Sequence, residues 1–141
     1  MVALTREQQE AIDSGLRQLP APVTLVYYTP DVPSSATAAE RALLEAMARA
    51  SDRVHLRVLA ERWDAEREAE AGIARTPAIA MLGAGDTGIR YYGTPDGYEL
   101  ETFVAILRAV SEGRSGLGEA TRARVAALRE PRHLEVLVAP T

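Results

Sequence analysis

Apolar residues recur along this chain at two spacings, one typical of helices and one typical of strands. Residues 12–19 carry apolar side chains at helical spacing after a capping box formed by Thr5 and Gln8, and Pro20 ends that run. Residues 23–28 are apolar or β-branched on both faces, which predicts a central strand buried on both sides. The chain therefore opens with a helix followed by a buried strand.

The same alternation continues through the middle of the chain. A helix can begin at any of three hydroxyl residues, which are Ser34, Ser35 and Thr37. Glu40 follows Thr37 at the spacing of a second capping box. The spacing then predicts a strand at 54–58, a helix at 60–71, strands at 77–82 and 89–93, and a helix at 100–110.

This order of elements limits the topology. A strand, a helix and a second strand form a β-α-β unit, which requires parallel pairing and a right-handed crossover. The strands at 77–82 and 89–93 flank a polar turn and are expected to pair as an antiparallel hairpin. The sequence thus predicts an α/β fold with a four-stranded mixed sheet and helices on both faces.

A further helix and strand are predicted after this fold is complete. Residues 113–118 read as a linker, 119–128 as a helix and 133–138 as a strand. Each of the strands at 23–28 and 133–138 follows a helix and a proline and ends in a threonine–proline pair, which is a weak internal repeat. We therefore expect one domain at 1–113, and in 114–141 a linker, a helix and the start of a second, similar unit. The last strand is expected to need a partner, either its own sheet edge or a second chain in a dimer.

Composition narrows the classes of function. A net charge of −4 argues weakly against a nucleic-acid partner. No apolar run approaches 18 residues and the first residues do not resemble a signal peptide, so we expect no membrane association and a cytoplasmic location. The two histidines, His55 and His133, have no carboxylate or thiol at ligand spacing, so no metal site is expected. The glycines at 83–88 lack a phosphate-binding spacing, and Trp63 is more simply a cover for the sheet than a contact surface.

The chain contains no cysteine, which excludes thiol catalysis by this chain alone. Its first strand nevertheless runs into a short loop and then a helix that opens on serines, at 28–35. A helix N-terminus lowers the pKa of a thiol, so redox proteins with a Cys-x-x-Cys motif place the first cysteine at such a point. Val32 and Ser35 occupy the two positions that the cysteines would take.

The sequence resembles the tandem thioredoxin-fold family, which includes protein disulfide oxidoreductases and the N-terminal domain of the alkyl hydroperoxide reductase flavoprotein subunit. The likeness covers essentially the whole chain, and 88–99 is its most specific part. Five stretches carry it: 28–35, 43–52, 72–77, 88–99 and 110–138. The resemblance implies a thioredoxin-like, glutaredoxin-like domain corresponding to the first of two units. The cysteines of a second unit would lie beyond residue 141.

The resemblance also implies site residues. Thr76 and Pro77 would form the cis-proline peptide that faces the active loop, and with Pro33 and Ser34 they would contact an extended partner chain. Three functions stay open. The chain is a structural or partner-binding module beside a redox protein or a second thioredoxin-like unit, a peptide-binding adaptor, or part of an active two-unit oxidoreductase. No catalytic residue and no cofactor is expected in this chain.

Overall fold

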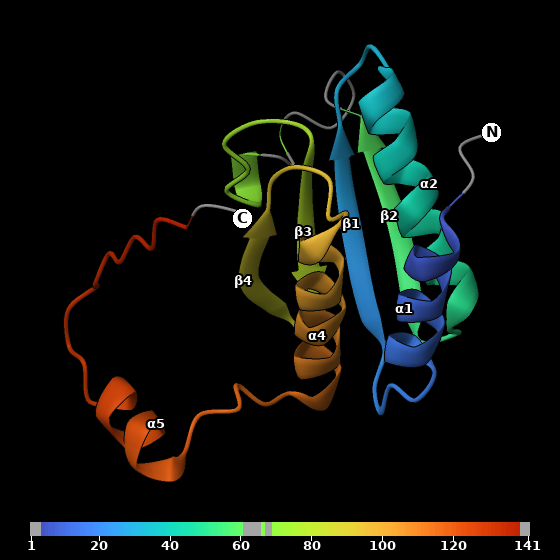
Figure 1. The fold of residues 1–141 in the computed structure, drawn as a ribbon. Coiled ribbons are helices and arrows are strands. Elements are labelled where there is room, and N and C mark those ends of the chain that lie inside the picture. Colours follow the sequence, from blue (N-terminus) through green and yellow to red (C-terminus); the bar gives the residue numbers. More distant parts are fainter. Residues whose placement is uncertain (1–3, 61–65, 67–68, 139–141) are drawn as a thin grey trace.

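A computed structural model describes residues 4–60, 66 and 69–138 of the chain. Four strands form one mixed sheet in the order β2-β1-β3-β4 (Figure 1). β1 pairs in parallel with β2 and antiparallel with β3, and β3 pairs antiparallel with β4. The strands are β1 (Val23–Thr29), β2 (Val54–Ala60), β3 (Ala78–Leu82) and β4 (Asp86–Tyr91). The predicted four-stranded mixed sheet and the α/β class are confirmed.

Three helices lie on one face of this sheet, in front of the strands in Figure 1. They are α1 (Arg6–Leu16), α2 (Ser35–Ala50) and α4 (Tyr98–Glu112). Their apolar stripes pack on the inward side chains of β1 and β3, and Tyr27 and Phe103 are the largest side chains fully buried there. Burying an aromatic or a large aliphatic side chain contributes about 1.5–3 kcal/mol, so this layer holds the fold together.

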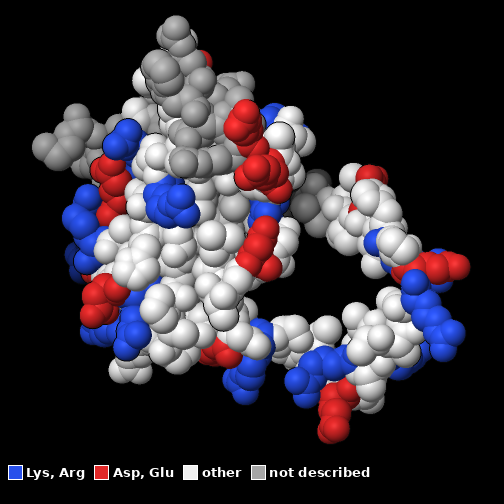
Figure 2. All heavy atoms as spheres, turned by 180° about the vertical axis from the view of Figure 1, so that it is seen from behind, with Lys and Arg blue, Asp and Glu red and all other residues white. Residues whose placement is uncertain are grey.

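The opposite face of the sheet carries a smaller apolar cluster. Val26, Tyr28 and Leu59 belong to it, and Ala71 and Ile73 pack against it. The predicted helix at 60–71 would cover this face, but most of it, with Trp63, lies outside the described residues. Figure 2 shows the molecule from this side.

Residues 114–138 form an arm that leaves the end of α4 and stands away from the body (Figures 1 and 2). The arm contains α5 (Glu119–Ala126), which buries no residue. The predicted strand at 133–138 is wrong for the isolated chain: these residues form no strand and their apolar side chains are exposed. A strand needs a neighbour to take its backbone hydrogen bonds, and no other strand of the described chain lies alongside it.

Among the described residues, no helix combines the length and the apolar character needed to cross a bilayer.

Candidate functional site

The candidate site is the loop that joins β1 to α2, together with the start of β3. β1 ends at Thr29, and every residue from Asp31 in the loop to Ala36 in the first turn of α2 is exposed. The side chain of Val32 is 80% exposed. Val32, which the sequence analysis places at the first cysteine position, is therefore at the surface and carries an unreactive side chain.

The start of α2 is fixed by a capping box formed by Ser34 and Thr37. The backbone N–H of Thr37 donates to Ser34 Oγ at 3.2 Å, and the backbone N–H of Ser34 donates to Thr37 Oγ1 at 2.8 Å. Ser34 is thus the N-cap, and Ser35 is the first helical residue. The alternative box of Thr37 and Glu40 does not form, because Glu40 turns into the core instead.

The register of the sheet places Pro77 at the same end as the loop. Tyr28 of β1 pairs with Ala78 of β3, so the residue before Ala78 lies level with the end of β1. The Thr76–Pro77 peptide bond is cis, and both residues are half-buried. The structure therefore brings the two sequence-predicted elements, 32–35 and 76–77, to one edge of the sheet.

Tyr92, just after β4, holds the segment that leads to Pro77. The backbone N–H of Ala74 donates to Tyr92 Oη at 3.1 Å, and the guanidinium of Arg75 lies 4.6 Å from the centre of the Tyr92 ring. A cation over an aromatic face is attracted by the ring quadrupole. These two contacts tie the approach to β3 to the opposite side of the hairpin.

A buried polar pair lies behind the loop and was missed by the sequence analysis. Tyr27 Oη donates to Glu40 Oε2 at 3.0 Å, which joins β1 to α2. Glu40 is 1% exposed, and its other oxygen, Oε1, has no hydrogen-bond partner among the described residues. Glu40 lies three and four residues before Leu43 and Leu44, so its place on the buried stripe of α2 was a signal present in the sequence.

Burial controls the protonation of this pair. Desolvation raises the pKa of Glu40 to about 7, although the hydrogen bond from Tyr27 acts in the opposite direction. Burial and the nearby Glu40 also raise the pKa of Tyr27 well above its ordinary value. The pair thus holds an exchangeable proton in the core near neutral pH, but it does not open to the surface of the loop.

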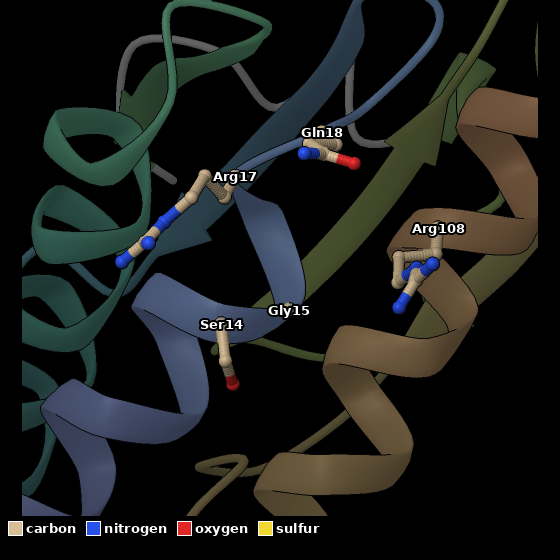
Figure 3. A pocket seen from close by; sticks show the side chains of 5 residues that line it. All are labelled: Ser14, Gly15, Arg17, Gln18 and Arg108. Carbon is tan, nitrogen blue, oxygen red and sulfur yellow. The ribbon is translucent and has the colours of Figure 1, made fainter.

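Two further groups of residues do not build a site. A hollow between α1 and α4 has a volume of about 370 Å³. The guanidinium groups of Arg17 and Arg108, which line it, do not converge on one point (Figure 3). His55 is exposed on β2 and His133 lies on the arm, where its Nε2 is 2.8 Å from Glu135 Oε1. No cluster of three potential metal ligands occurs in the ranges that the structure describes.

Comparison with solved structures identifies the fold. A protein disulfide oxidoreductase from Aeropyrum pernix K1 matches with a TM-score of 0.77 and 20% identity over 91% of this chain and 56% of that one. The alkylhydroperoxide reductase AhpF from Enterococcus faecalis (V583) matches with a TM-score of 0.76 and 20% identity over 89% and 61%. The NTD_N/C domain of the same protein gives a TM-score of 0.76 and 21% identity over 91% and 62%. No family model and no curated protein matches the sequence.

The chain therefore has a thioredoxin-like fold, and the predicted similarity to the tandem thioredoxin-fold proteins is confirmed at the level of the fold. The chain spans about three fifths of the length of these proteins. The activities named for them belong to those whole proteins, and at this identity the likeness concerns the fold.

Proposed function

We propose that this chain is a non-catalytic thioredoxin-fold module that supports or binds a protein partner in a disulfide- or peroxide-reducing system. One observation carries the proposal: β1 runs into an exposed loop and then α2, and the resemblance to redox thioredoxin-fold proteins assigns Val32 and Ser35, neither of which carries a thiol, to the two cysteine positions. A thiolate is the attacking group in disulfide exchange, and neither residue supplies one.

The proposal includes two parts of the chain, as the order of elements and the resemblance predict them. Residues 1–113 make up the thioredoxin-like unit, and 114–141 are a linker, a helix and the start of a second unit. The structures named above extend well beyond the matched region, which supports a second thioredoxin-like unit as the partner, in the same chain or in another. A homodimer is a further form of this partnership. The cytoplasmic location stays a prediction.

A reduction assay tests the absence of catalysis. The wild-type chain with dithiothreitol and insulin should precipitate insulin no faster than dithiothreitol alone. A Val32→Cys/Ser35→Cys variant is the positive control, because it returns both thiols to the loop. Turnover by the wild-type chain above the dithiothreitol background would refute the proposal.

The second candidate function is binding of extended peptides at Pro33, Ser34, Thr76 and Pro77. The observation in its favour is the exposed Val32 at the sheet end that also carries the Thr76–Pro77 peptide. Carboxymethylated, unfolded α-lactalbumin is a suitable probe, with amide chemical shifts as the readout. Shifts confined to the loop and to Thr76, and lost in Val32→Asp, would support the adaptor. Unchanged spectra at millimolar probe would refute it.

A further inference from the structure

The N-terminal turns of α1 and α4 enclose a groove with an acidic rim and an apolar floor. Its volume is about 560 Å³. Glu7 and Glu101 are exposed on the rim, and Leu100, which is 3% exposed, forms part of the floor. The full lining is Thr5, Glu7, Gln8, Ala11, Gly97, Tyr98, Leu100 and Glu101.

Tyr98 is the unusual member of this lining, because its side chain is 86% exposed. The helix dipole favours acidic residues in a first helical turn, so Glu7 and Glu101 need no binding partner to explain them. That effect does not account for an exposed aromatic beside them. Tyrosine is enriched at protein interfaces relative to the rest of the surface.

The arm, residues 114–138, has the complementary chemistry. Nine large hydrophobic side chains are exposed in the described part of the chain, and seven of them lie between Leu117 and Val138. The arm also holds five arginines and three glutamates, a net charge of +2. Residues 1–113 hold eleven arginines and seventeen acidic residues, a net charge of −6, and the two parts sum to the −4 of the chain. The arm therefore combines most of the exposed large apolar side chains with a positive net charge.

Exposed apolar side chains and arginines lie close together on α5 and the residues that follow it. Arg124, Val125 and Leu128 fall on one face at helical spacing, and Arg122 lies one turn before Val125. Val125 and Leu128 are each 53% exposed. Within the described residues, Arg122 and Arg124 make no ion pair, whereas Arg132 pairs with Glu130. An apolar pair flanked by two unpaired cations matches a groove with an apolar floor and two unpaired carboxylates.

We propose that the arm of one chain docks through α5 into the acidic groove of a second copy, and that the second copy returns the same contact. That the partner is a second copy rests on the proposed partner-binding role. That the arm fits the groove rests on the opposite charges of the two surfaces. To dock in the groove of its own chain, the arm would have to run back along α4, because it leaves the C-terminal end of α4 and the groove lies at the N-terminal end. The 15 residues of α4 span about 22 Å. In Figure 1 the arm instead runs away from α4. Reciprocal exchange gives a closed two-fold dimer.

A charge exchange on the full chain tests this directly. One variant, Glu7→Lys/Glu101→Lys, makes the groove basic, and the other, Arg122→Glu/Arg124→Glu, makes the arm acidic. Each variant alone should raise the dimer dissociation constant about tenfold or more, because like charges then face each other in both contacts. An equimolar mixture should form heterodimers, since both contacts again join opposite charges. The quadruple variant should form homodimers for the same reason.

Sedimentation equilibrium with native mass spectrometry is the measurement, at 50 mM and 500 mM NaCl. The wild-type dimer should weaken at the higher salt, as a contact between exposed charges requires. The arm substitutions lie on a helix that buries nothing, so the arm variant reports on docking even if the groove variant is unstable. A monomeric wild type at high micromolar concentration would overturn the proposal. Dimers unaffected by either charge reversal would overturn it as well, and would leave the insulin result and the non-catalytic role untouched.

Discussion

The hydroxyl of Tyr27 on β1 donates to Glu40 on α2 across 3.0 Å of buried core. Glu40 lies five residues after Ser35, so this pair links the central strand to the helix that begins at the candidate site. Because no described residue offers Glu40 Oε1 a hydrogen bond, the protonated carboxyl suits this position better than the carboxylate.

The first expectation concerns pH. The pKa of Glu40 is raised from 4.5 to about 7 on folding, so the folded state holds a proton that the unfolded state has lost. The free energy of unfolding should therefore fall as pH rises from about 4.5 and level off above pH 7. Between pH 5 and pH 8 the contribution of Glu40 amounts to about 2–3 kcal/mol. Urea unfolding curves at the two pH values measure it.

Glu40→Gln is the matched variant, because glutamine has the same shape and does not ionise. Its unfolding free energy should change less with pH than that of the wild type, by about the same 2–3 kcal/mol. Equal pH slopes for the two proteins would show that Glu40 titrates normally in the folded state.

The second expectation concerns the loop. Val32 and Ser35 have the spacing of the two cysteines in a Cys-x-x-Cys motif, Ser35 is the first residue of α2, and both are exposed. Val32→Cys/Ser35→Cys should form one intramolecular disulfide, with a mass loss of about 2 Da that dithiothreitol reverses. The single variant Val32→Cys should react with a maleimide and form no such bond. An oxidised double variant that appears only as cross-linked dimers would contradict the proposed placement of the loop.

The sequence predicted the four-stranded mixed sheet, because its strands carry strong local patterns, although β4 begins at Asp86 rather than at the predicted residue 89. β1 is apolar on both faces and β3 is bounded by Pro77 and Gly83, so neither has a competing assignment. The capping box of Thr5 and Gln8 is also formed as predicted, with the backbone N–H of Gln8 donating to Thr5 Oγ1 at 3.1 Å. These features depend on residues within a few positions of each other.

What could not be predicted depends on residues distant in the chain. The 133–138 segment has the pattern of a strand, but a strand forms only where another strand accepts its hydrogen bonds. The stripe of α2 indicates that Glu40 is buried, but its hydrogen bond from Tyr27 joins two separate elements and leaves no local pattern. The groove between α1 and α4 joins residues about 90 positions apart, which no local pattern records.

The third expectation concerns the contact between α4 and the turn before β1. Ser111, which is 5% exposed, accepts a hydrogen bond from the backbone N–H of Ala21 at 3.0 Å and donates to the carbonyl oxygen of Ala21 at 2.6 Å. Ser111→Ala removes both bonds and leaves two backbone groups unpaired, which should cost about 1–3 kcal/mol. Thermal and urea unfolding measure the loss.

Ser14→Ala is the control for that substitution, since Ser14 is an exposed helical serine that bonds only within its own helix. Its effect should stay within about 0.5 kcal/mol. Equal losses for the two serines would mean that the bonds to Ala21 contribute nothing specific.

The last expectation concerns the close approach of α1 to α4. A Cβ atom added at Gly15 would lie 2.1 Å from Val104 Cγ1, well inside the contact distance of two carbons. Gly15→Ala should therefore destabilise the chain by about 1–3 kcal/mol, even though alanine favours a helix over glycine by about 1 kcal/mol. Val104→Ala removes the clashing methyl groups. The double variant should therefore lose less unfolding free energy than the two single variants lose together, by about 1 kcal/mol or more. Gly85→Ala is the control, because nothing lies within 4 Å of its added Cβ. Strict additivity of Gly15→Ala and Val104→Ala would show that the two helices do not approach each other at this point.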